Sequence, residues 1–122
     1  MEVVGIEEIL PITADSAVSF DVDFVLPKGA AGVEVYVTTS DKQTSPTWTF
    51  GLAALTPAGG AVTKITSANV DDSNTTTRIA ILPGVTAVAN QIANDVVPGK
   101  CRLVATRTDG TYDIQAYAVY YK

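Results

Sequence analysis

The chain has 122 residues, with 8 Lys and Arg against 13 Asp and Glu, so its formal net charge is -5 at pH 7. The eight basic residues are scattered singly and make no stripe that could neutralise phosphates, which argues against a general nucleic-acid binder. Cys101 is the only cysteine, so no intrachain disulfide can form, and no apolar run approaches the length of a membrane span. We expect a protein that is synthesised in a cytoplasm and builds its core without a disulfide or a metal.

Residues 1–16 differ from the rest of the chain. They mix aliphatic side chains with three glutamates, and their acidic start is unlike a signal peptide. Pro11 has no N–H to donate, which confines the segment to an edge strand or an extended arm. Asp15 and Ser16 then favour a turn. We therefore divide the chain into an N-terminal arm or edge strand, 1–16, and a single domain, 17–122.

Three strands with period-two alternation follow. The clearest runs from Val18 to Leu26, and two more occupy 32–40 and 47–54. Because a strand places alternate side chains on opposite faces, each run predicts one buried row and one outer row. We expect Trp48 and Phe50 at the centre of the core. The predicted buried rows are Val18, Phe20, Val22, Phe24 and Leu26, then Val33, Val35 and Val37, and then Trp48, Phe50, Leu52 and Ala54.

The next part of the chain is divided by turn residues. Short strands are predicted at 61–66 and 75–82, and the polar loop between them holds Asp71 and Asp72. Residues 85–97 place apolar side chains at helical spacing, yet their two Asn residues and the Pro-Gly pair that follows suit an irregular crossing. We expect a long loop there, with at most a turn or two of helix.

The last stretch, 101–121, contains two strand-like runs that meet at Asp109-Gly110. An Asp-Gly pair between alternating apolar residues is the strongest short-range hairpin signal, because a type I′ turn needs positive φ at both central positions. We therefore predict that the two runs form an antiparallel hairpin. With Tyr120 in the core, its outer row is more apolar than a solvated strand requires, which suggests a contact surface.

Seven or eight short strands, separated by turn signals and without a convincing long helix, indicate an all-β fold. The arrangement that we predict is an antiparallel β-sandwich of 7-8 strands. The spacing of the strands leaves both a jelly-roll and an immunoglobulin-like connectivity open.

Few residues in the sequence suggest catalysis or metal binding. There is no histidine, so Ser-His and Cys-His nucleophiles cannot be built, and no phosphate-binding glycine loop occurs. Asp21 and Asp23 share a strand face, but alternating acids on a solvated face need no function. The loop Asp71-Asp72-Ser73-Asn74 lacks the ligand spacing of an EF-hand, and opportunistic calcium is the minor alternative. We predict no catalytic, cofactor-binding or metal-binding residues, and we expect Cys101 to be a small buried hydrophobe.

Tyrosines offer a second hypothesis from another functional class. If Tyr36, Tyr112 and Tyr117 gathered on one exposed patch, they would suit a sugar-stacking platform. A carbohydrate-binding or receptor-binding β-sandwich module of a tail or head appendage is therefore the alternative function. Core and interface positions for these aromatic side chains are the preferred interpretation.

Several short motifs resemble the small virion proteins of tailed bacteriophages. The similarity extends over roughly the last two-thirds of the chain, and it starts with Thr44-Ser45-Pro46-Thr47 before a strand. It continues with Leu82-Pro83-Gly84-Val85-Thr86-Ala87-Val88-Ala89-Asn90, Asp95-Val96-Val97-Pro98, Cys101-Arg102-Leu103-Val104-Ala105 and Asp109-Gly110-Thr111-Tyr112.

This resemblance implies a β-sandwich decoration or cement protein, without enzymatic activity or cofactor, on the outer head surface of a virion. Its partners would be the major capsid protein, whose neighbouring subunits it bridges, and sister subunits in a dimer or trimer, with no nucleic acid and no membrane. The N-terminal arm could add a strand to a neighbour's sheet edge. The residues that we expect to make these contacts are Val3, Val4, Ile6, Ile9, Leu10, Tyr117, Val119 and Tyr121.

Overall fold

The computed structural model describes residues 1–72, 74–97 and 99–122, with the backbone alone for residues 14 and 15. The expectation of an all-β chain is confirmed, since the described residues form strands and no helix. Ser73 of the acidic loop and Pro98 of the phage-like motif lie outside the described residues. The seven strands are β1 (Val3–Ser16), β2 (Phe20–Val25), β3 (Gly32–Leu55), β4 (Ala61–Thr66), β5 (Thr75–Ile81), β6 (Ile92–Ala93) and β7 (Lys100–Tyr121).

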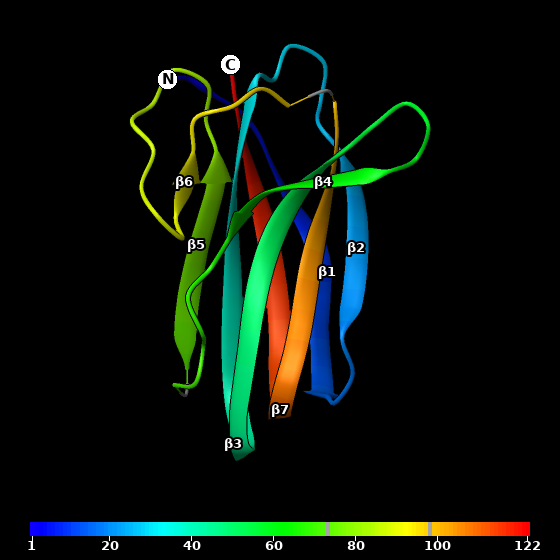
Figure 1. Cartoon of the computed structure of the whole chain (residues 1–122), viewed down its shortest axis with the longest axis vertical. Coiled ribbons are helices and arrows are strands. Elements are labelled where there is room, and N and C mark those ends of the chain that lie inside the picture. The colour runs from blue at the N-terminus through cyan, green and yellow to red at the C-terminus, as the bar shows by residue number, and fades with distance from the viewer. Residues whose placement is uncertain (73, 98) are drawn as a thin grey trace.

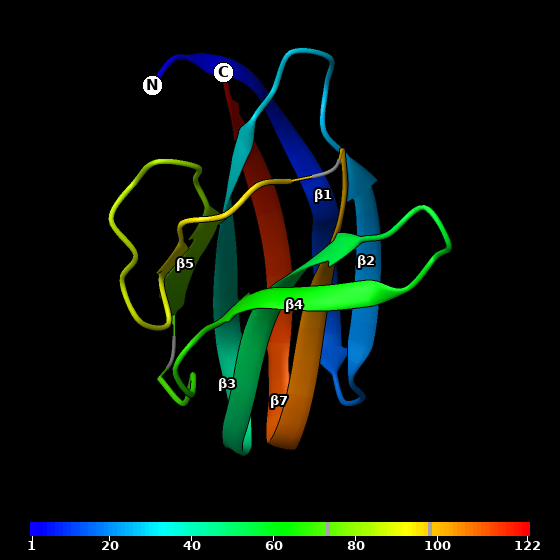
Figure 2. The same cartoon turned by 45° about the horizontal axis from the view of Figure 1, so that its top comes forward.

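All seven strands belong to one hydrogen-bonded sheet with the order β1-β7-β3-β5-β6, in which β2 also pairs with β7 and β4 with β3. The expectation of a purely antiparallel arrangement is wrong, because β6 pairs with β5 in parallel, Ala80 opposite Ile92. The chain leaves β5 through a turn with Gly84 in a positive-φ conformation, and the loop returns toward the start of β5 before β6 begins (Figure 2). No helix forms within 85–97, as expected, but the segment is not all loop, because the short strand β6 lies within it.

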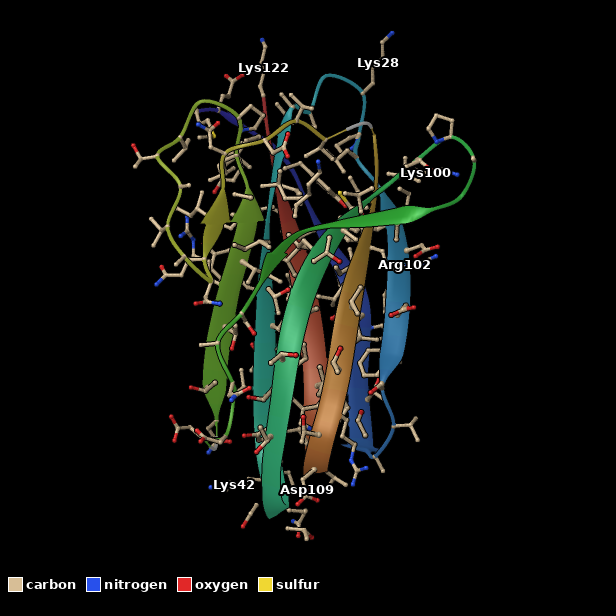
Figure 3. The ribbon with its side chains drawn as sticks, in the orientation of Figure 1. Lys28, Lys42, Lys100, Arg102, Asp109 and Lys122 are labelled. Carbon is tan, nitrogen blue, oxygen red and sulfur yellow. The ribbon has the colours of Figure 1, made fainter. Side chains whose placement is uncertain are left out.

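The two long strands, β3 with 24 residues and β7 with 22, form the centre of the fold. They pair antiparallel from Gly32 opposite Tyr121 to Ala54 opposite Cys101. Both strands turn back at the same end of the molecule (Figure 1), where Figure 3 places the labelled Lys42 and Asp109. In β3 the turn is made by residues 41–46, which include three non-glycine residues with positive φ. The β3–β7 ribbon is thus folded over itself.

The predicted hairpin at Asp109-Gly110 is wrong. The two halves of β7 do not pair with each other; both pair with β3, whose two halves on either side of residues 41–46 carry the buried side chains. Gly110 has a φ of 66°, but Asp109 is not among the residues with positive φ, so the type I′ condition is not met. A Cβ at Gly110 would lie 2.3 Å from the Cα of Pro46. The glycine therefore permits close packing of the two turns.

One hydrophobic cluster takes side chains from both halves of the folded ribbon. Trp48 and Phe50 are fully buried, as predicted, with ring centroids 6.2 Å apart in a stacked arrangement. Val18, expected in a buried row, is exposed because β2 begins only at Phe20. Other members of the cluster are Phe24, Leu26, Val33, Val35, Val37, Leu52, Leu103, Ile114, Ala116, Ala118 and Tyr120.

Candidate interaction surface

In the second half of β7, every other side chain points away from the core. Ala116, Ala118 and Tyr120 are buried, so the residues between them point outward because a strand alternates its side chains. These outward residues are Tyr117, which is exposed, and Val119 and Tyr121, which are half-buried. The predicted outer row of β7 therefore lies where it was expected.

Neighbouring strands extend this outward row in register. Ile6 of β1 lies opposite Val119, and Val3 lies opposite Tyr121. On the other side of β7, Tyr36 of β3 lies opposite Tyr117. Directly paired residues present their side chains on one face at close range. We call this surface the outer face, and it consists of Val3, Ile6, Tyr36, Tyr117, Val119 and Tyr121.

The outer face is apolar where Val3 and Ile6 of β1 contribute to it, whereas Glu8 of β1 lies opposite Tyr117. Ile6 is 69% exposed and Val3 is 50% exposed, although the solvated face of an antiparallel sheet usually carries polar residues. Because each of them stands beside an apolar or aromatic partner on β7, they form one patch. Such a patch marks a contact surface more often than a solvated one.

Three predicted contact residues of β1 do not belong to the outer face. Ile9 and Leu10 are half-buried and pack against the core, because the register shifts between Glu8 and Leu10 and turns Leu10 inward, opposite Ala116. Val4 lies at another register shift and lines a hollow of about 400 Å³ between β1 and β2. The alternation was too irregular for the sequence to assign these side chains.

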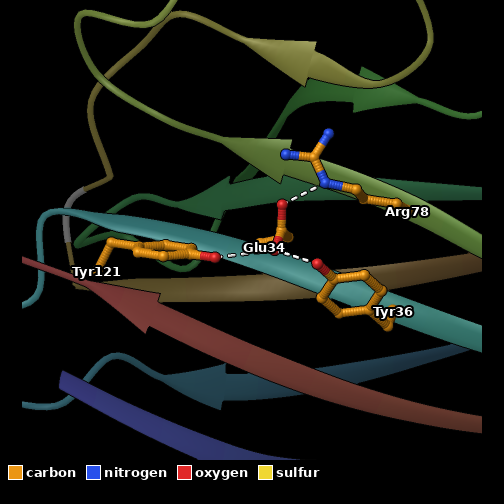
Figure 4. A network of polar contacts seen from close by, with 4 residues as sticks. All are labelled: Glu34, Tyr36, Arg78 and Tyr121. Atoms are coloured by element: carbon orange, nitrogen blue, oxygen red, sulfur yellow. Dashed lines mark hydrogen bonds and ion pairs between the residues drawn. The ribbon is translucent and has the colours of Figure 1, made fainter. Parts of the chain in front are cut away.

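Glu34 lies in the middle of a polar network beside the outer face (Figure 4). Its side chain is only 4% exposed. The phenol of Tyr121 donates a hydrogen bond of 2.9 Å to Oε1, and the phenol of Tyr36 donates to the same oxygen. Nε of Arg78 donates to Oε2 and forms an ion pair with it. Donors from β3, β5 and β7 thus satisfy one buried carboxylate.

These contacts fix the protonation states of the network. Burial alone would raise the pKa of Glu34, but the hydrogen bonds from Tyr36, Tyr121 and Arg78 outweigh it, and the pKa lies below its ordinary value. The hydrogen bond to Glu34 is the main cause that raises the pKa of Tyr36. Burial, together with the bond to Glu34, raises the pKa of Tyr121 to about 12. At neutral pH the acceptor is therefore charged and both phenols keep their protons.

Two further contacts hold β1 against β7. Nε2 of Gln115 donates to Oε2 of Glu8 at 2.8 Å, and the phenol of Tyr120 donates to Oε1 of Glu7 at 2.6 Å. A hydrogen bond with Glu8 also raises the pKa of Tyr117. The glutamates of β1 therefore attach this strand to the aromatic strand that it accompanies.

The tyrosine platform of the alternative hypothesis is incomplete. Tyr36 and Tyr117 lie opposite each other on the outer face, but Tyr112 is fully buried, and its phenol donates a 2.6 Å hydrogen bond to the carbonyl oxygen of Asp72. The turn that places Tyr112 inward could not be read from spacing. Two neighbouring tyrosines remain available on this face.

The other groups considered for catalysis are occupied or buried. Burial raises the pKa of the Cys101 thiol to about 12, which keeps it protonated. Asp23 accepts from Nε of Arg102 at 2.6 Å, and this bond holds the pKa of the carboxyl below its ordinary value, opposite to what a general acid needs. No three Cys, Asp or Glu side chains converge on a possible metal position within the described residues.

The sequence did not indicate the network around Glu34. The alternation of 32–40 correctly placed Glu34 on the face of the strand opposite to the buried valines. A carboxylate on that face was expected to be solvated. The side chain is buried because Tyr121 and Arg78 reach it from neighbouring strands. Only the register between β3, β5 and β7 could have given that signal.

Comparison with known proteins gives no family. No model of a protein family matches the chain. A search of curated proteins also finds no significant match. Among the described residues, none forms a helix with the length and apolar character that crossing a bilayer requires.

Proposed function

We propose that this chain is a structural, non-enzymatic protein that binds another protein through its outer face. One observation carries the proposal: Ile6 and Val3 of β1 are exposed in register with Val119 and Tyr121 of β7, so apolar side chains of two strands form one surface. Burial of this surface against a partner would be favourable by about 25 cal/mol for each Å² of apolar area removed from water.

Two of the three tyrosines on the outer face are already held by hydrogen bonds in the free chain. Tyr36 and Tyr121 are both held by hydrogen bonds to Glu34. Ordering a mobile side chain at an interface costs roughly 0.5–1.5 kcal/mol, and a held side chain avoids much of that cost. Tyrosine also contributes an apolar ring and a polar tip, which suits contact surfaces.

The proposed architecture is a two-layer β-sandwich of the jelly-roll or immunoglobulin-like kind. The folding of the β3–β7 ribbon supports it, because residues from both halves of the ribbon enter one hydrophobic cluster. The pairing of β1 with the second half of β7, and of β2 with the first half, gives each layer its own edge strand. The outer face would be the solvent side of the layer that contains β1.

The partner that we propose is the major capsid protein of a tailed bacteriophage, on the outer surface of the head. The short motifs shared with small phage virion proteins support this assignment. The arrangement of β1 fits it as well, because β1 pairs with β7 on one side only and stands at the end of the strand order. The remaining backbone edge can take a strand from a capsid subunit or from a sister subunit in a dimer or trimer.

Cosedimentation with assembled heads tests the proposal. The purified chain should sediment with heads at a fixed copy number, and decorated heads should resist heat better than bare heads. Ile6→Asp puts a charge into the outer face and should weaken binding at least tenfold. Val62→Asp is the matched control, because Val62 is an exposed valine on β4, outside the outer face. Equal binding by the two variants, or no binding by the wild type, would overturn the proposal.

A further inference from the structure

A cleft of about 410 Å³ lies at the edge of β5, next to the outer face. Three segments line it: residues 67–72, which follow β4, residues 75–78 of β5, and Asn90 with Gln91 from the loop before β6. Ser67 and Val70 are buried, whereas Asn69, Asp71 and Gln91 are exposed. The volume is in the usual range for a small-molecule site, which is roughly 300–1,000 Å³.

The chemistry of the lining selects the ligand. Among the lining residues only Ala68 and Val70 have apolar side chains, although the methyl groups of the threonines and the stem of Arg78 also give the cleft apolar surface. Amides, hydroxyls, carboxylates and a guanidinium supply both donors and acceptors. The side chains of Asn69 and Gln91 make no hydrogen bond within the described part of the chain, so they can bond a ligand without losing an existing partner.

Charge argues against an anionic ligand. Arg78 is the one basic residue among those that line the cleft, and its charge is already paired with Glu34, while Asp71 and Asp72 line the same cleft. The lining therefore carries net negative charge. A metal ion is also disfavoured, because no third acidic side chain converges there among the residues that the structure describes.

Arg78 is the positioned donor of the cleft. Its Nε is held by Glu34, and its side chain is still 37% exposed, so the terminal nitrogens keep N–H groups for another acceptor (Figure 4). A buried carboxylate is costly unless it is fully bonded. Hydrogen bonds from three side chains offset the cost of burying Glu34. One of these three side chains is Arg78, whose guanidinium is therefore positioned at the wall of the cleft.

We propose that this cleft binds a neutral saccharide. Vicinal hydroxyls donate and accept at once, which matches a lining that combines Asp and Asn acceptors with Arg and amide donors. Arg78 contacts the sugar, Glu34 acts as a positioning residue, and Asn69 and Gln91 supply further hydrogen bonds. The site adjoins the outer face at one point, because Arg78 lies opposite Tyr36, while its other lining residues pair with no residue of the outer face.

Amide chemical-shift titration by NMR tests this site. The probes are glucose, galactose, lactose and diacetylchitobiose, with inorganic phosphate and spermidine as charged comparisons. At least one neutral saccharide should give saturable shifts confined to 67–72, 75–78 and 90–91. Shifts elsewhere only, no saturation with any saccharide, or tighter binding of phosphate or spermidine would overturn the proposal.

Substitutions assign the binding to named side chains. Arg78→Gln should weaken saccharide binding about tenfold or more, since it removes a charged donor. Arg102→Gln is the matched control, because Arg102 pairs with Asp23 on β2 and does not line the cleft. Gln91→Ala provides a second test in case Arg78→Gln fails to fold. It should weaken saccharide binding severalfold and leave the melting temperature unchanged. Wild-type affinity in both Arg78→Gln and Gln91→Ala would contradict the assignment.

Discussion

Glu34→Gln is the substitution that most directly probes the buried network. The carboxylate accepts from Tyr36 and Tyr121 through one oxygen and from Arg78 through the other. A glutamine has nearly the same shape but only one acceptor oxygen. If that oxygen keeps the two phenols, the amide NH₂ faces the guanidinium, and two donors oppose each other.

The cost can be worked out from these contacts. The substitution removes one charge-assisted hydrogen bond, worth about 1.5–3 kcal/mol, and it weakens the two that remain. Because Arg78 is partly exposed, water can solvate its guanidinium, which keeps the loss well below that of a fully buried ion pair. We expect the free energy of unfolding to fall by about 2–3 kcal/mol. For a domain of this size the melting temperature should drop by roughly 5–15 °C.

Urea unfolding followed by tryptophan fluorescence gives the measurement, since Trp48 is fully buried and will report on the core. Asp23→Asn is the matched control, because it makes the same change in an ion pair whose acidic side chain is 53% exposed. That variant should have a midpoint indistinguishable from the wild type. If the two substitutions lowered the free energy of unfolding equally, the conclusion that burial makes the Glu34 network strongly stabilising would be refuted.

Three further results follow from single contacts. Gly110→Ala adds a Cβ against Pro46 as well as positive-φ strain, so it should cost about 2–5 kcal/mol in a urea titration. Gly29→Ala, with nothing within 4 Å of the added Cβ, should cost only about 1–2 kcal/mol, and parity between the two would contradict the packing role. Folding raises the pKa of Tyr121 from 10.0 to about 12, so the folded state favours the protonated phenol. The stability that this phenol contributes is complete below pH 10.0 and is lost as the pH rises toward about 12. Tyr121→Phe should therefore flatten the alkaline fall in unfolding free energy, and an unchanged profile would count against it. The Cys101 thiol should react with a maleimide only in denaturant, so rapid labelling of the native protein at neutral pH would be inconsistent with its burial.

The local part of the fold could be predicted from the sequence. Period-two alternation identified the buried valines of β3 and the central pair Trp48 and Phe50, because alternation depends only on neighbouring residues. The all-β class followed from the same signal. Core positions within a regular strand are therefore accessible from the sequence alone.

Long-range pairing could not be predicted in this way. Asp109-Gly110 indicates a chain reversal, and the chain does turn there, but the sequence cannot say whether the two flanking runs pair with each other or with a distant strand. The burial of Glu34 depends on which residues of β5 and β7 lie beside it. The inward positions of Ile9 and Leu10 depend on register shifts in β1. All of these are properties of pairing between strands.

Hydrogen–deuterium exchange of the chain bound to assembled heads tests the central claim most directly, since it reports which face becomes covered. The proposed contact predicts slower exchange in residues 3–8 of β1 and residues 117–121 of β7 when the chain is bound, with β2 and β4 unchanged. Protection confined to β2 and β4, with β1 exchanging as in the free chain, would contradict it.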